Sequence, residues 1–230
     1  MTEASTKFQV SLYQVYSDVP FENWGMTVRN TPKYTFFPTT VLGIQNLVKY
    51  ANKMDLRVRC AGYRHTWSSS FSQDNEILVS FVDLELVTTL PDPSSLLPGH
   101  YSGANVPELK TIELKEQTAP NKRLCRIGAA VTNEEFRYWS VAGNAWALPC
   151  NVIMVEITMG GANAPICHGA GLRHKTLSDY VRRIEYVDCH GQKQIVDDSE
   201  LIRAAAGACK STTTWLRPLM LFDDVLIRSV

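Results

Sequence analysis

The sequence predicts a mixed α+β fold arranged in two lobes. Segments with helical periodicity and short β-prone runs follow each other irregularly, without the repeated strand–helix–strand order of a wound parallel sheet. A stretch rich in proline, glycine, serine and asparagine, residues 91–123, divides these segments into two groups. Each group contains strands and at least one helix, so we expect two α+β lobes joined by a long connection.

Composition places the chain among ordinary soluble globular proteins. Of its 230 residues, 45% are hydrophobic and 20% are charged, and 23 basic residues balance 23 acidic ones. The balance gives no electrostatic reason to expect nucleic acid or an anionic membrane as a partner. No apolar run approaches the ~20 residues that span a bilayer, and the first residues lack the order of a signal peptide. We therefore expect an intracellular, cytoplasmic location and reduced cysteines.

The first lobe is expected over residues 22–96, after an N-terminal arm, residues 1–21, with weak periodicity. Apolar residues at three- and four-residue steps predict a helix over residues 41–54, with Thr39 or Thr40 as its N-cap. The strands expected in this lobe are residues 34–37, 57–62, 76–82 and 84–90.

The second lobe is expected over residues 97–208, followed by a divergent tail, residues 209–230. Thr132, with Glu135 three residues later, predicts a capping box at the start of a helix that ends near Gly143. A hairpin tip is predicted at residues 190–191, and a further helix over residues 197–207. The strands expected here are residues 111–114, 124–131 and 152–159 and the end of 177–188.

Residues 160–171, GGANAPICHGAG, form a small-residue segment after an apolar run. Bare backbone allows several N–H groups to approach one ligand, as in pyrophosphate-binding loops. The segment matches neither the dinucleotide-binding fingerprint nor a P-loop. A tight loop with glycines at positive φ is the alternative, and composition alone favours neither.

Residues 57–71, RVRCAGYRHTWSSSF, place His65 in a polar turn after a β-prone run. Taken alone, such a histidine is most often a hydrogen-bonded loop residue. A cysteine and histidine zinc site is a further alternative, but adjacent ligands would point to opposite faces of a strand. Its candidate ligands are Cys167, His168, His174, Cys189 and His190.

Several segments, in order along the chain, together resemble one flavoprotein family. They include the turn Gly-x-x-His-Thr and, about a hundred residues later, Glu-Ile-Thr-x-Gly-Gly and Cys-His-Gly-x-Gly. The chain resembles the FAD-binding domain of the vanillyl-alcohol oxidase / para-cresol methylhydroxylase (PCMH-type) family, and within it the gulonolactone- and arabinonolactone-type sugar-lactone oxidases. The matching segments are residues 23–51, 57–71, 124–136, 148–161, 166–188 and 200–207.

The resemblance implies a PCMH-type FAD-binding domain in which two loops contact FAD. His65 would occupy the position that many members link covalently to the flavin. Relatives usually have glycine just before that histidine, where this chain has Arg64; its guanidinium can pair with the diphosphate or crowd the turn. The cofactor-binding residues implied are Arg59, Ala61, Gly62, Tyr63, Arg64, His65, Thr66, Gly160, Gly161, Cys167, His168, Gly169 and Gly171.

The function implied is that of a flavin-dependent oxidoreductase, an oxidase acting on a hydroxyl-bearing small molecule such as a sugar or lactone. The substrate domain that follows in the family has no counterpart before the chain stops, so we expect a truncated domain with an incomplete second lobe. Resemblance is lost near Cys209, which suggests a frameshift, a retained intron or a truncated gene model. The alternatives are a catalytically inactive remnant of such an enzyme and, less favoured, a metal-binding module.

Overall fold

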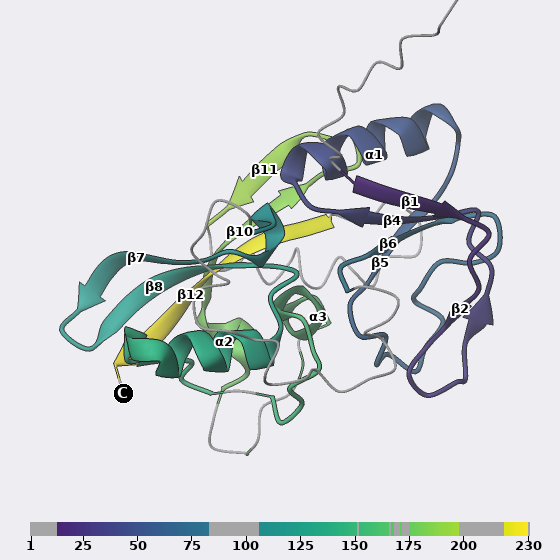
Figure 1. The fold of residues 1–230 in the computed structure, drawn as a ribbon. Helices are drawn as coiled ribbons and strands as arrows, with labels where there is room; N and C mark the ends of the chain where they lie inside the picture. The colour runs from purple at the N-terminus through teal and green to yellow at the C-terminus, as the bar shows by residue number, and fades with distance from the viewer. Residues whose placement is uncertain are drawn as a thin grey trace, which may run out of the picture.

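The computed structural model describes residues 13–82, 106–150, 152–165, 167, 171, 175–197 and 219–229. These residues form a mixed fold of helices and strands, as predicted, with two main sheets and a small two-stranded one (Figure 1). No helix among the described residues is both long and apolar enough to cross a membrane.

The first sheet has the strand order β1-β4-β6-β5. Its two inner pairings are parallel, while β1 joins β4 in antiparallel register. The presence of β1 corrects the prediction of an N-terminal arm for residues 13–17, where weak periodicity concealed an edge strand. The bounds are β1 Tyr13–Ser17, β4 Tyr34–Pro38, β5 Val58–Ala61 and β6 Ile77–Ser80, with β2 Phe21–Glu22 and β3 Arg29–Asn30 forming the two-stranded sheet.

Helix α1, Val41–Lys53, follows β4 and confirms the predicted helix. Thr40 is its N-cap, because its side-chain oxygen accepts a hydrogen bond from Gly43 N over 3.0 Å. The apolar spacing gives the helix one buried face, which packs into the main core of the first sheet. The residues of that face include Ile44, Leu47, Val48 and Ala51.

The second sheet has the order β11-β10-β12-β8-β7, and all its pairings are antiparallel. The hairpin predicted at residues 190–191 is confirmed, because Gly191 takes φ +73° between β10 and β11. The bounds are β7 Ile112–Ala119, β8 Lys122–Gly128, β9 Trp146–Ala147, β10 Val181–Val187, β11 Lys193–Val196 and β12 Leu219–Ser229.

Strand β12 lies in the segment predicted as a divergent tail. It pairs with β10 on one side and β8 on the other, so it is an inner strand of the second sheet. Leu221, Phe222, Val225 and Ile227 are buried along it. The prediction of an incomplete second lobe is therefore not confirmed, because the predicted tail supplies an inner strand of the described sheet.

Two short helices and three turns accompany the second sheet. Helix α2, Asn133–Trp139, begins with the predicted capping box of Thr132 and Glu135, but it ends earlier than residue 143. The chain continues through a wide turn, Ser140–Asn144, in which Gly143 takes φ +97°. Helix α3 spans Met159–Asn163, and 3-10 turns occupy Glu108–Lys110 and Leu177–Tyr180.

The strand predicted over residues 152–159 is not formed. Only an isolated bridge between Thr132 and Thr158 pairs this segment, and Ile153 is 88% exposed. An apolar, β-branched run cannot be assigned to a sheet without a partner strand, and here none is adjacent among the described residues. The strand expected at residues 84–90 and the helix expected at 197–207 lie outside the described residues.

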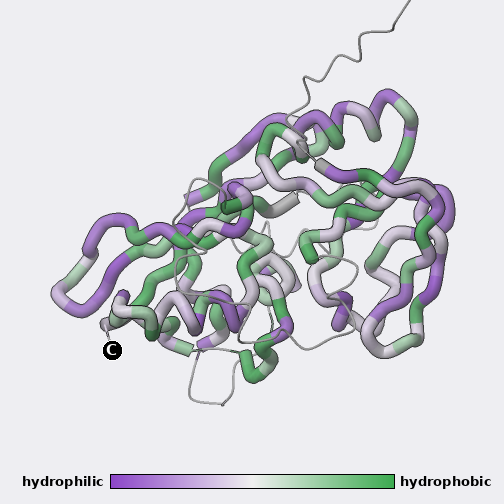
Figure 2. The backbone as a smooth tube through the Cα atoms, viewed as in Figure 1, coloured by the Kyte–Doolittle hydropathy of each residue, from purple (hydrophilic) through white to green (hydrophobic). Residues whose placement is uncertain are grey.

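The two main sheets share one hydrophobic core. Side chains of α1 and of the first sheet meet Val187, Leu221 and Phe222 of the second sheet. Helix α1 also contacts the β10–β11 hairpin, because the Asn52 amide donates to the main-chain oxygen of Cys189 over 2.7 Å. Hydrophobic stretches recur along the strands of both sheets (Figure 2). This shared core fixes the turn after β5 relative to the segment before α3.

Candidate functional site

The turn that follows β5, residues 62–66, carries a row of free main-chain donors. Among the described residues, the N–H groups of residues 63–66 donate to no other group. The turn lies at the carboxyl end of a parallel strand, where ligands of α/β sheets often bind. Successive N–H groups in a turn form a concave site for anions. The geometry therefore fits an anionic group, as the sequence predicted for this turn.

Arg64 takes φ +63° in this turn, the left-handed region that favours glycine. Its side chain is buried, and its guanidinium lies 4.6 Å from the ring centre of Phe21. Nη1 donates to the main-chain oxygen of Glu22 over 3.3 Å, whereas Nε and Nη2 have no hydrogen-bond partner. Burial lowers the pKa of Arg64 to about 10, so the group keeps its charge at neutral pH.

The turn lies against a segment nearly a hundred residues later in the sequence. A Cβ atom placed on Gly62 would lie 2.5 Å from Thr158 Oγ1, so a side chain at this position would displace Thr158. Thr158 Oγ1 also accepts a hydrogen bond from Gly161 N over 3.1 Å and thereby caps α3. Thr158 thus connects the first predicted loop, at Gly62, to the second, at Gly161.

His65 makes the second connection between these segments. Its Nε2 lies 2.6 Å from the main-chain oxygen of Glu156. Because a carbonyl oxygen only accepts, Nε2 carries the proton and Nδ1 holds the free lone pair. No described group makes a hydrogen bond with Nδ1. A neutral imidazole with an open nitrogen is a nucleophile and a proton acceptor.

Aromatic side chains surround His65. Its ring stacks on Tyr63, with centroids 6.3 Å apart, and lies 5.4 Å from the ring of Trp24. Burial, with the charges of Glu135 and Glu156, raises the pKa of Tyr63 to about 12. Tyr63 therefore stays a neutral phenol through the physiological range and does not act as a base.

The second predicted loop differs from expectation at its start. Residues 159–163 form the helix α3 rather than a loop, and neither Gly160 nor Gly161 has positive φ. Gly160 N donates to the main-chain oxygen of Ala129 over 3.1 Å, and a Cβ there would lie 3.0 Å from Ala129 Cβ. Gly160 is thus needed for close packing, and its N–H is not free for a ligand.

The other predicted site residues are distributed as follows. Arg59 and Ala61 lie in β5, and Thr66 is exposed, with its main-chain oxygen accepting from the Asn23 amide over 3.1 Å. Burial raises the pKa of the Cys167 thiol, so it stays protonated at neutral pH. Gly171 is exposed, and His168 and Gly169 lie outside the described residues.

The alternative zinc site is not assembled in the part of the chain that the structure describes. Cys167, Cys189 and His190 do not gather with other histidine, cysteine or acidic residues into a group of three. Cys189 instead lies in the hairpin that contacts α1. His168 and His174 fall outside the described residues.

Two residues of the site, Glu156 and Thr158, were not predicted from the sequence. Both belong to the Glu-Ile-Thr-x-Gly-Gly motif, but only its glycines were assigned to the cofactor. The acidic side chain of Glu156 is not what contacts His65; its main-chain oxygen does. Nothing in a local pattern signals a main-chain contact, so only the motif as a whole could have indicated this segment.

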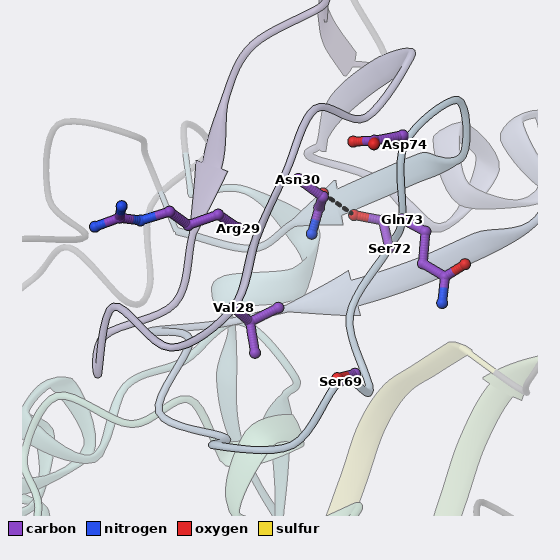
Figure 3. Close-up of a pocket in the computed structure, with 7 residues that line it drawn as sticks. All are labelled: Val28, Arg29, Asn30, Ser69, Ser72, Gln73 and Asp74. Atoms are coloured by element: carbon purple, nitrogen blue, oxygen red, sulfur yellow. Dashed lines mark hydrogen bonds between the residues drawn. The ribbon is translucent and has the colours of Figure 1, made fainter.

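A pocket of about 350 Å³ lies beside β3 and the loop of residues 69–74 (Figure 3). A hydrogen bond from Ser72 Oγ to Asn30 Oδ1, 3.4 Å long, crosses its lining. The lining includes none of the predicted cofactor-binding residues. Its members are Val28, Arg29, Asn30, Ser69, Ser72, Gln73 and Asp74.

Comparison with known proteins identifies the fold. No protein-family model matches the sequence, and no curated protein matches it either. Among solved structures, the chain is similar to cholesterol oxidase from B. sterolicum, with 13% identity, a TM-score of 0.64 and coverage of 99% of this chain and 39% of the other. It is also similar to a solvent-stable cholesterol oxidase, with 14% identity, a TM-score of 0.67 and coverage of 99% and 40%.

A third similar structure is wild-type BBE-like 1 from Physcomitrella patens, with 14% identity, a TM-score of 0.62 and coverage of 95% of this chain and 42% of the other. The chain thus spans 39% to 42% of the length of these three structures. At such low identity the comparison establishes the fold, which is one found in oxidases. FAD is the cofactor that the sequence resemblance implies.

The residues of the turn fit FAD. Four N–H groups that donate to no described group suit the oxygens of a diphosphate. Two nitrogens of the buried Arg64, Nε and Nη2, have no hydrogen-bond partner among the described residues, so an anion could pair with them. Gly62 keeps the turn close to Thr158 without a side chain between them. His65 offers Nδ1 from the same turn.

Proposed function

We propose that this chain forms the FAD-binding domain of a flavin-dependent oxidoreductase. The observation that carries the proposal is the turn of residues 63–66 at the end of β5, whose N–H groups donate to no other described group. The similarity of the fold to oxidase structures supports the same assignment. Since the chain spans under half of those structures, the activity of the whole protein is part of the proposal.

In this proposal the turn holds the FAD diphosphate by its N–H groups, while Gly161, Cys167, His168, Gly169 and Gly171 line the second side of the site. Gly160 contributes by letting α3 approach Ala129. The Glu156 main-chain oxygen orients the His65 ring and holds the proton on Nε2. His65 Nδ1 is then the atom available for contact with the flavin, or for a covalent link to it.

The proposed substrate is a hydroxyl-bearing small molecule of the sugar or aldonolactone class, as the sequence resemblance implies. Bound FAD would supply the capacity to accept a hydride from the substrate and to pass the electrons to oxygen or another acceptor. The residues of this chain bind and orient the cofactor. We assign no general base.

Purification with FAD supplied tests the binding part of the proposal. We expect a yellow protein with a flavin spectrum; colour in the pellet after acid precipitation indicates a covalent link, and colour in the supernatant a dissociable cofactor. A colourless protein with stoichiometric zinc would contradict the proposal. His65→Ala should lose any acid-stable flavin, and retention of it would exclude His65 as the attachment point.

Anaerobic mixing of the yellow protein with sugars and aldonolactones tests the substrate class. Loss of the flavin absorbance with one of these classes supports the proposed oxidoreductase activity. Stable absorbance with all of them contradicts the substrate assignment and favours an inactive flavin-binding remnant, without affecting the evidence for FAD binding.

A further inference from the structure

Arg64 is a buried cation for which the described residues provide no counter-charge. Arg64 exposes only 6% of its surface to solvent, and no described carboxylate lies within ion-pair distance of its guanidinium. Glu22, whose main-chain oxygen it contacts, directs its own carboxylate to Arg29. Burying an unpaired charge is costly, because the protein interior does not replace the lost hydration.

The backbone adds a second cost at the same position. At φ +63° any residue with a Cβ is disfavoured relative to glycine. Arg64 therefore combines an unfavourable backbone conformation with an unfavourable desolvation. Glycine would avoid both costs and would leave the path of the turn unchanged.

Two of the contacts that Arg64 makes within the chain do not need its charge, whereas the third, with the Phe21 ring 4.6 Å from the guanidinium, uses the charge without providing an opposite one. The hydrogen bond from Trp24 N to Arg64 O, 2.9 Å long, is made by the main chain and would survive any substitution. The single bond from Nη1 to Glu22 O needs only a neutral donor. The unpartnered Nε and Nη2 atoms are the part of the side chain that these contacts leave unexplained.

The Arg64 charge and the free N–H groups belong to the same short turn. Arg64 N is one of the four N–H groups that have no acceptor, and the guanidinium belongs to the same residue. In surroundings of low dielectric constant, a unit charge acts on an anion across several ångströms. An anion held at the turn would thus interact with the N–H dipoles and would also provide the counter-charge that Arg64 lacks among the described residues.

We propose that Arg64 supplies the counter-charge for a diphosphate bound by residues 63–66. The inference rests on the proposed function, in which this diphosphate belongs to FAD. It assigns to Arg64 a binding role that glycine at the same place could not have, and it excludes the alternative that the side chain merely crowds the turn.

Equilibrium binding of FAD and of inorganic pyrophosphate to the full chain tests this role. We compare the native chain with Arg64→Gln, which keeps a neutral donor; Arg64→Lys, which keeps the charge; and Arg64→Gly, which suits the backbone. Hydrogen bonds to charged groups are worth about 1.5–3 kcal/mol, so Arg64→Gln and Arg64→Gly should weaken both ligands by about tenfold or more. Arg64→Lys should bind more tightly than either.

Arg29→Gln is the matched control, because it removes the same charge from the neighbouring hairpin at a side chain that is 69% exposed. It should change FAD affinity by less than about twofold. The thermal midpoint of each ligand-free variant reports whether it folds. If Arg64→Gln does not fold, the comparison of the native chain with Arg64→Gly still tests the role of the charge.

The outcomes separate this inference from the proposed function. If the native chain binds FAD and Arg64→Gly binds it equally well, Arg64 has no such role, while FAD binding stands. If pyrophosphate binds to no form but FAD binds to all equally, the counter-charge lies elsewhere. A native chain that binds neither ligand overturns both proposals.

Discussion

Gly62, Arg64 and His65 each give the turn after β5 a different property. The missing side chain of Gly62 lets the turn approach Thr158, Arg64 brings a buried positive charge, and His65 donates to the Glu156 main-chain oxygen. Two of these three properties depend on residues 156–158, which come from the other half of the chain. The ligand-binding capacity of the turn is therefore set by a long-range contact.

Substitution of Gly62 tests that contact directly. In Gly62→Ala the new methyl would lie 2.5 Å from Thr158 Oγ1 and 3.0 Å from Thr158 Cγ2, so the two segments must move apart. We expect a loss of about 1–3 kcal/mol in the free energy of unfolding, measured by urea denaturation, and weaker FAD binding.

The double variant Gly62→Ala/Thr158→Ala is the control for this prediction. Thr158→Ala alone should cost about 1 kcal/mol, because it removes the cap of α3. Since it also removes the two atoms that clash, the double variant should be more stable than the sum of the single effects. Simple additivity would show that the cost of Gly62→Ala arises from another contact.

At the scale of elements, the sequence predicted those helices whose formation depends on interactions between residues close together in the chain. The apolar spacing of α1 with Thr40, and the reciprocal bonds of Thr132 and Glu135 at α2, were predicted from the sequence and are present. The run 152–159 resembled a strand, but strand formation depends on a partner that a single segment cannot reveal. The contact between His65 and Glu156, 91 residues apart, was beyond any local pattern.

Strand β12 was missed for a different reason. The prediction for this segment rested on its lack of resemblance to the family and not on its own pattern. In that pattern Leu221, Val225 and Ile227, which are buried, recur at even spacing, as on one face of a strand. The pairing of β12 with both β8 and β10 shows that residues 219–229 contribute to the folded domain.

A pair of isoleucine substitutions measures that contribution. Ile227 is 0% exposed in β12, whereas Ile195 is 56% exposed in β11 of the same sheet. Ile227→Ala should lower the free energy of unfolding by about 2–5 kcal/mol, and Ile195→Ala by about 0.5 kcal/mol or less. Equal effects in urea denaturation would mean that β12 is not an inner strand.

Glu185 of β10 gives the second sheet a pH-dependent interaction. Burial alone would raise its pKa, but hydrogen bonds from Lys193 of β11, 2.7 Å, and Arg126 of β8, 2.9 Å, outweigh burial and lower it. A carboxylate whose folded pKa is depressed stabilises the protein above its unfolded pKa, and this stability is lost as the pH falls through the folded pKa.

Glu185→Gln should therefore destabilise the chain at neutral pH, by about 1–3 kcal/mol for the loss of charged hydrogen bonds. The difference between native chain and variant should shrink as the pH falls below the unfolded value of 4.5. Urea denaturation over a pH series measures it. A difference that is independent of pH would show that packing, rather than charge, accounts for the effect.

At the scale of the whole molecule, one buried cluster spans both sheets, and the second sheet has a further cluster of its own. Val48 of α1 and Val79 of β6 belong to the same buried cluster as Val187 of β10 and Phe222 of β12. The Gln45 amide of α1 also donates to the main-chain oxygen of Gly191 over 3.2 Å. Neither sheet can lose its structure without exposing part of this cluster, so the site between the turn and residues 156–158 depends on both.

We therefore expect a single cooperative unfolding transition for the chain. In a variant whose Trp139, Trp146 and Trp215 are replaced by phenylalanine, the fluorescence of Trp24 and Trp67, beside the first sheet, should change at the same urea concentration as the secondary-structure signal, to which the second sheet contributes most of its strand residues. Phe222→Ala, which enlarges a cavity in the shared cluster, should lower both midpoints together. Two separate midpoints, or a Phe222→Ala shift confined to one signal, would mean that the sheets fold independently and that the shared core does not hold the site together.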